Sequence, residues 1–136
     1  QMGSTLDLIN TFASLSGGKV PEDRKMDGYD LSKVLTEKAV SPRKDFYYWG
    51  FAQLHGYRTE QFKLHIKQRE PVYYGRPTIV LDTPELYDMR ADISEKYDVA
   101  TDHPDLVDKM LYKIDEHLKD VEGSTPDQLV ERLPKK

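Results

Sequence analysis

The sequence predicts an α+β fold in which a small antiparallel sheet is packed by one C-terminal amphipathic helix, with a further helix before the sheet. Three observations predict it. Strand-forming residues fill positions 46–88, apolar residues recur at helical spacing over 104–122, and a capped apolar segment spans 4–18. With 136 residues and a mass of 15.8 kDa, the chain suits one domain or a part of one.

The first predicted helix covers residues 4–18. Ser4 followed by Asp7 fits the capping-box pattern that begins a helix, and Gly17 can end it because glycine accepts the left-handed conformation of a helix stop. Apolar residues cover both sides of this short helix, so we expect burial on more than one face. They are Leu6, Leu8, Ile9, Phe12, Ala13 and Leu15.

Residues 19–45 are predicted to be an extended connection. Pro21 and the pair Asp27-Gly28 have the chemistry of turns, and Ser41-Pro42 marks another break. One helical turn is expected near Val34, where Leu31, Val34 and Leu35 follow Asp30.

The predicted antiparallel sheet covers residues 46–88. Residues 46–49 form a strongly strand-forming aromatic run, and residues 62–67 alternate strictly between apolar and polar. Residues 59–61 are short enough for a hairpin turn between two strands. Three further segments are separate strand candidates: 72–74, 78–81 and 85–88.

The last predicted helix covers residues 104–122, with Pro104 at its first position and Gly123-Ser124 after its end. An apolar stripe repeats every four residues and is widened by its neighbours, so we expect Leu111 and Ile114 to be buried against the sheet. The stripe consists of Leu106, Val107, Met110, Leu111, Ile114, Leu118 and Val121. Residues 123–136 are predicted to be a tail.

The composition excludes several classes of protein. Aromatic residues make up 10% of the chain, which argues against disorder. No apolar run approaches the roughly 18 residues of a membrane helix, and no signal-peptide pattern opens the chain. The net charge of −4 argues against a nucleic-acid partner, which requires a basic face.

The motifs predict no catalytic residue and no metal site in this chain. It has no cysteine, so disulfides, thiolate zinc sites and cysteine nucleophiles are excluded. The four histidines are scattered without the paired spacing of metal ligands. The sequence also lacks an EF-hand loop, a phosphate-binding glycine loop and the nucleophile elbow of serine hydrolases.

Three residues are candidates for contact with a substrate. Tyr48 and Trp49 can stack against a sugar or aryl group, although such an aromatic run more often alternates between the core and the edge of a sheet. His55 lies beside aromatic residues where a loop meets a strand, which makes it a better ligand-facing candidate than His65. His65 is expected to be an ordinary strand-face residue.

Five segments, taken in order, resemble the C-terminal part of sulfatases of the arylsulfatase type, in the alkaline phosphatase-like superfamily. Residues 4–17 are similar to the family's D-L-x-P-T-x-x-x-L-A-G, with Asn10 in place of its proline. The other four segments resemble P-x-D-R-x-x-D-G-x-D-L-S (20–32), S-P-R-x-x-x-F-Y-Y (41–48), A-V-R-x-G-x-W-K-L (56–64) and L-Y-D-L (86–89).

The resemblance implies a C-terminal fragment of a sulfatase, with a sheet of about four strands and a helix packed across it. The subdomain would span residues 4–122, and the helix at 4–18 would lie at the junction with the missing N-terminal catalytic domain. The parent would hydrolyse sulfate esters of small molecules or glycans with a formylglycine residue and a divalent cation, usually calcium. None of the residues that carry this chemistry in the family matches a position here.

The resemblance also implies what this part does. It would brace the catalytic domain and line the substrate pocket, in a parent that is periplasmic, secreted or lysosomal, as the family commonly is. Cut free from that domain, the chain is expected to self-associate through residues 5–16. The alternative is a self-standing carbohydrate-binding or interaction module that uses residues 46–49 and His55 as a sugar-stacking surface.

Overall fold

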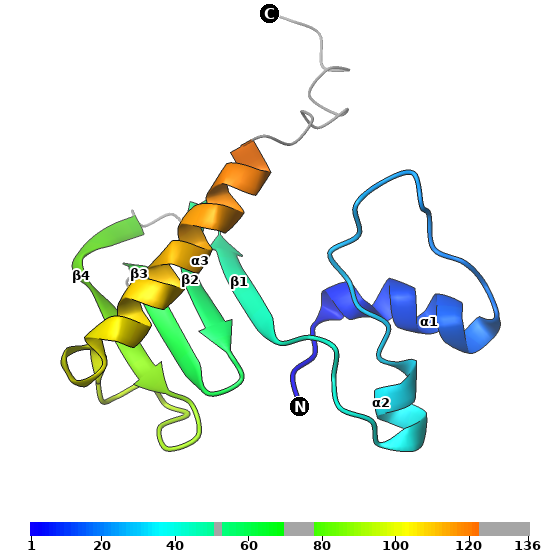
Figure 1. The fold of residues 1–136 in the computed structure, drawn as a ribbon, viewed down its shortest axis with the longest axis horizontal. Coiled ribbons are helices and arrows are strands. Elements are labelled where there is room, and N and C mark those ends of the chain that lie inside the picture. Colours follow the sequence, from blue (N-terminus) through cyan, green and yellow to red (C-terminus); the bar gives the residue numbers. More distant parts are fainter. Residues whose placement is uncertain (51–52, 70–77, 123–136) are drawn as a thin grey trace, which may run out of the picture.

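The computed structural model describes residues 1–50, 53–69 and 78–122, and it confirms the α+β fold (Figure 1). A four-stranded antiparallel sheet is crossed by the long helix α3, and a second lobe beside β1 holds two shorter helices. The elements are a 3-10 turn (Thr5–Asp7), α1 (Leu8–Ser16), α2 (Ser32–Glu37), β1 (Asp45–Gly50), β2 (Gln53–Thr59), β3 (Phe62–Arg69), β4 (Thr78–Asp88), a second 3-10 turn (Ala100–Asp102) and α3 (Pro104–Glu122). No helix in these ranges has the length and apolar character needed to cross a membrane.

The sheet is a meander in which the strands lie in the order β1-β2-β3-β4. The predicted hairpin turn is confirmed, since β2 ends at Thr59 and β3 begins at Phe62. Between β1 and β2 the register shifts, because Tyr48 pairs with Gly56 while Trp49 pairs with Leu54. His55 is therefore the extra residue of a β-bulge, a feature that turns side chains out of the regular alternation.

The prediction of two separate strands at 78–81 and 85–88 is wrong, because both segments belong to the single strand β4. Pro84 lies between the two segments, and proline has no N–H to donate to a neighbouring strand. The pairing passes from His65–Glu85 directly to Lys67–Val80, so residues 81–84 lie in an irregular stretch opposite Ile66. Pro84 therefore lies at a position where no backbone N–H is needed to pair β4 with β3.

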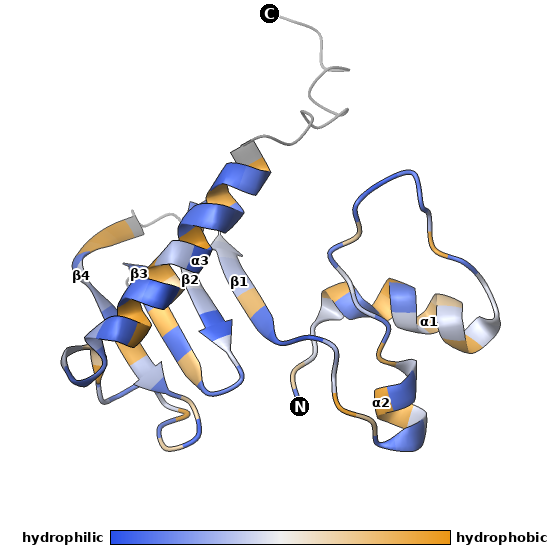
Figure 2. Ribbon diagram, in the orientation of Figure 1, coloured by the Kyte–Doolittle hydropathy of each residue, from blue (hydrophilic) through white to orange (hydrophobic). Residues whose placement is uncertain are grey.

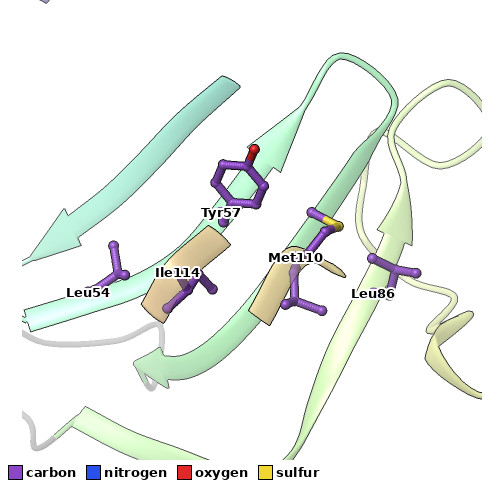
Figure 3. Packing of buried hydrophobic residues seen from close by; sticks show 6 residues of the cluster. Leu54, Tyr57, Leu86, Met110 and Ile114 are labelled. Atoms are coloured by element: carbon purple, nitrogen blue, oxygen red, sulfur yellow. The ribbon is translucent and has the colours of Figure 1, made fainter. Parts of the chain in front are cut away.

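The hydrophobic core lies between the sheet and α3 (Figure 3). It consists of Leu54, Tyr57, Leu64, Leu86, Met110 and Ile114, which are all buried. Leu64 and Leu86 pair across β3 and β4 and are completely buried, and Met110 and Ile114 join their cluster from consecutive turns of α3. Burial of each such side chain stabilises the fold by about 1.5–3 kcal/mol. Leu111, which was expected to be buried, is only half-buried at the edge of this contact.

The first helix begins and ends as predicted. Ser4 and Asp7 form both hydrogen bonds of the capping box, and Gly17 adopts the left-handed conformation with a φ of 73°. The expected burial of its apolar residues is wrong, however, because the side chain that α1 buries is that of Thr11. Its apolar side chains remain largely exposed, namely Leu6 (49%), Leu8 (46%), Ile9 (62%), Phe12 (60%) and Leu15 (52%). Figure 2 shows these hydrophobic residues in orange along α1.

A buried ion pair links the first helix to the start of the sheet. Asp7 and Arg43 are 1% and 6% exposed, and the Arg43 Nε lies 2.9 Å from the Asp7 Oδ2. Asp7 also accepts hydrogen bonds from the backbone N–H groups of Ser4 and Tyr29. Burial by itself raises the pKa of Asp7, but the hydrogen bonds from Arg43, Tyr29 and Ser4 outweigh it and leave that pKa below its usual value.

The connection at 19–45 contains the predicted helical turn, which the structure shows as the six-residue helix α2. Pro104 is the first residue of α3, as predicted. The strand candidate at 72–74, the helix stop at Gly123-Ser124 and the tail at 123–136 lie outside the described residues.

Candidate functional site

A hollow of about 480 Å³ lies on the face of the sheet that points away from α3. Tyr57, Leu64 and Leu86 point into the core, so the residues next to them on each strand point to the opposite face. Residues from all four strands and from the loop before α3 form the wall of this hollow, which we call the sheet hollow. Its lining is Tyr48, Trp49, Gly50, His55, Gly56, Lys63, His65, Lys67, Gln68, Tyr87 and Glu95.

The structure brings the three predicted substrate-contact residues together in this one hollow. Tyr48 and Trp49 come from β1, and His55 comes from the β-bulge of β2. The bulge places His55 next to Gly56, whose backbone approaches the Leu64 carbonyl so closely that a Cβ atom would collide with its oxygen. A glycine is therefore required at the floor of the sheet hollow.

A carboxylate and two basic side chains form a hydrogen-bonded cluster in the hollow. The Lys63 Nζ lies 2.6 Å from the Glu95 Oε1, and the His65 Nε2 lies 2.7 Å from the Glu95 Oε2. Burial by itself raises the pKa of Glu95, but Lys63 and His65 outweigh it and hold that pKa below its usual value. Lys63 also lies 4.7 Å from the centre of the Tyr48 ring, a cation–π contact that gives this wall both aromatic and cationic character.

Sequence reasoning did not find Glu95. It lies in the polar run between β4 and α3, about 30 residues from its partners on β3, and its backbone adopts a left-handed φ of 55°. No periodicity in the sequence marks such a residue, because its position depends on how the loop folds back against β3. His65 does lie on the strand face, as expected, and the contact with Glu95 gives it a defined orientation.

A second polar group lies beside β4. The Tyr87 hydroxyl donates a hydrogen bond of 2.8 Å to the Glu85 Oε2, which also accepts a hydrogen bond from the Gln68 side-chain amide. Burial and the neighbouring Glu85 raise the pKa of Tyr87, so this phenol stays protonated at physiological pH.

The chemistry of the sheet hollow favours binding over bond cleavage. Its described lining offers aromatic rings, hydrogen-bonding groups and cations, the combination with which proteins bind sugars that carry negative charge. That lining contains no serine, threonine or cysteine to act as a nucleophile. Within the described ranges, no three His, Cys, Asp or Glu side chains converge to hold a metal ion. The described residues therefore offer no set of ligands for a bound cation.

Comparison with known proteins defines the class. Residues 41–134 match the protein family described as the C-terminal region of aryl-sulfatase, which places the chain in the sulfatase class. The chain belongs to this family, and its α+β fold is that of a C-terminal sulfatase subdomain.

Individual relatives agree with this assignment. An arylsulfatase of Hemicentrotus pulcherrimus is 26% identical over an alignment 147 residues long, which covers 90% of this chain and 27% of that protein. Human arylsulfatase A is 28% identical over 114 residues, covering 73% of this chain and 22% of that protein. The solved structure of BT4656, in complex with its substrate D-glucosamine-2-N,6-O-disulfate, has a TM-score of 0.58 and 26% identity, and covers 88% of this chain and 24% of that chain. The chain thus spans about a quarter of the length of these relatives.

Proposed function

We propose that this chain is the C-terminal part of a sulfate ester hydrolase, in which it braces the catalytic domain and forms part of the substrate pocket. The observation that carries the proposal is the combination of family membership with partial coverage. The chain matches the C-terminal region of aryl-sulfatase but covers only 27% of the arylsulfatase of Hemicentrotus pulcherrimus. The remaining length of the parent would hold the catalytic domain.

The catalytic chemistry belongs to that other part of the parent. A formylglycine residue and a calcium ion would supply the nucleophile and stabilise developing negative charge, as the resemblance to arylsulfatases implies. The residues of this chain bind and orient the substrate and exclude water beside the catalytic centre. That division of labour agrees with a hollow whose described lining has no hydroxyl of serine or threonine and no set of metal ligands.

The bracing role is supported by the apolar face of α1. Leu8, Ile9 and Phe12 are largely exposed in this chain, and Leu6 and Leu15 are exposed as well. Contiguous apolar patches of this kind mark interaction surfaces. Packing against the catalytic domain would remove this surface from water, with about 25 cal/mol gained for each Å² of apolar area buried.

The pocket role is tested in the full-length parent with Trp49→Ala. Stacking of an aromatic ring contributes about 0.5–1.5 kcal/mol, so we expect KM for D-glucosamine-2-N,6-O-disulfate or another sulfated sugar to rise up to about tenfold with kcat little changed. Tyr112→Ala is the matched control, because Tyr112 is an exposed aromatic on α3 and does not line the hollow. An unchanged KM in Trp49→Ala would contradict the proposal that the sheet hollow forms part of the substrate pocket.

A self-standing carbohydrate-binding module is the second candidate, favoured by the aromatic rim that Tyr48 and Trp49 form on the sheet hollow. The gene sequence upstream of this segment distinguishes the two candidate functions. A reading frame that continues upstream through a Cys/Ser-x-Pro-x-Arg nucleophile motif supports the sulfatase. A native start codon close to Met2 supports the module.

A further inference from the structure

Trp49 lies on the edge strand β1, between the sheet hollow and α3. It is one of the residues that line the hollow, and its indole Nε1 lies 3.1 Å from the Nε2 of His117 on α3. The His117 ring in turn stacks on Tyr47, with ring centres 3.8 Å apart and an angle of 11° between the planes. His117 on α3 therefore contacts two aromatic residues of β1, Tyr47 and Trp49.

The direction of this hydrogen bond fixes the protonation state of His117. The indole nitrogen can only donate, so the Nε2 of His117 must accept through its lone pair. A neutral imidazole with its hydrogen on Nδ1 satisfies that requirement. A protonated imidazolium carries hydrogens on both nitrogens, and its Nε2–H would oppose the indole N–H.

The charged groups around His117 come from three elements. Asp120 lies one turn further along α3, Lys25 and Asp27 belong to the connection, and Asp45 belongs to β1. Lys25 and Asp120 form an ion pair with each other. Burial of the ring lowers the pKa of His117, the nearby carboxylates raise it and Lys25 lowers it, with the pKa left below its usual value. The imidazole is therefore neutral near pH 7, as the hydrogen bond requires.

We propose that His117 is a positioning residue for Trp49: the neutral imidazole holds the indole at the rim of the sheet hollow, and protonation of His117 releases it. Ligand binding at this rim then weakens as the pH falls, a consequence that rests on the proposed function of the hollow. Protonation of His117 on α3 would therefore change how Trp49 is held at the sheet hollow.

The coupling can be measured without any ligand, because Trp49 is the only tryptophan in the chain. We expect its fluorescence to change in one step as the pH is lowered from about 8 to about 5, with a midpoint below the ordinary histidine value of about 6.5. His117→Gln offers a carbonyl acceptor that cannot titrate, so this variant should keep the spectrum of the native protein at high pH and lose the step.

His103→Gln is the matched control, because His103 lies at the start of α3 in contact with Phe62 rather than Trp49. It should retain the step. A flat titration of the native chain, or a step that persists unchanged in His117→Gln, would overturn the coupling. A melting curve of His117→Gln close to that of the native chain shows that the variant folds.

The ligand consequence uses D-glucosamine-2-N,6-O-disulfate as the probe, with Trp49 fluorescence as the readout. We expect the native chain to bind it several-fold more weakly below the midpoint than above it, and His117→Gln to bind it with an affinity much less dependent on pH. Binding that varies with pH equally in both proteins would overturn the role of His117. Absence of binding at every pH would instead overturn the proposed pocket and its ligand consequence, while the fluorescence step still decides the coupling of His117 to Trp49.

Discussion

At the scale of single residues, the buried contact between the first helix and the segment that enters the sheet is the ion pair of Asp7 and Arg43. Both side chains are almost completely buried, so neither can be solvated if the other is removed. We expect Asp7→Asn to lower the free energy of unfolding by about 3–5 kcal/mol, because the Arg43 guanidinium would remain buried without its counter-charge. Urea unfolding measures this. Asp23→Asn, in an exposed pair with Arg24, should change stability by less than about 0.5 kcal/mol.

The same pair predicts how stability depends on pH. The pKa of Asp7 is lower in the folded state than in the unfolded state, so the carboxylate stabilises the fold above the unfolded value of about 3.9. This contribution is lost as the pH falls through the folded pKa, because the unfolded chain takes up the proton first. Stability below about pH 4 should therefore fall more steeply in the native chain than in Asp7→Asn. Equal slopes in the two proteins would contradict this.

The sequence was informative about some of these residues and silent about others. Tyr48, Trp49 and His55 are recognisable because aromatic residues and a histidine gather around one break in a strand pattern, and the structure places all three in the sheet hollow. Glu95 and the partner of Asp7 are not recognisable, since each contact joins segments about 30 residues or more apart. Only folding brings such pairs together, and a single sequence does not show which residues far apart in the chain are in contact.

At the scale of elements, α3 offers the clearest test of packing. Met110 and Ile114 are 2% and 4% exposed, so Met110→Ala or Ile114→Ala should cost about 2–5 kcal/mol through lost burial and the cavity left behind. Lys109→Ala, on the exposed face, should cost less than about 0.5 kcal/mol. Denaturant unfolding of the three variants decides the matter, and equal losses on both faces would show that α3 packs in a different rotation.

The first helix offers a test of its exposed face. Phe12 is 60% exposed in the middle of the apolar patch on α1, so the chain by itself should self-associate through residues 5–16. Light scattering should give a mass above about 16 kDa that rises with concentration, and Phe12→Ser should reduce it. A monomer at all concentrations, unaffected by Phe12→Ser, would count against this interface and in favour of a domain that stands alone.

The elements themselves were largely predictable, and the exceptions have physical causes. Capping residues and an apolar stripe define the helices, and strict alternation defines β3. The length of β4 was not predicted, because the strand continues through an irregular stretch opposite Ile66, where Pro84 needs no hydrogen-bond partner for an N–H. The burial of α1 was misread because its apolar faces have no partner among the described residues of this chain.

At the scale of the whole molecule, the two lobes have different kinds of surface. The sheet and α3 enclose a core of their own, whereas the lobe of α1 and α2 buries polar groups and leaves most of its apolar residues exposed. A chain that covers about a quarter of its relatives' length has this asymmetry if a larger domain covers the first lobe. The sheet hollow lies on the other lobe.

The central claim is that sulfate ester hydrolysis belongs to the parent and that this chain contributes binding surface without a catalytic group. The most direct measurement compares the purified 136-residue chain with the full-length parent on a chromogenic aryl sulfate in the presence of calcium. We predict turnover by the parent and none above a matched blank by the chain. Turnover by the chain that survives repurification would contradict the account, as would a correctly matured full-length parent that hydrolyses no sulfate ester.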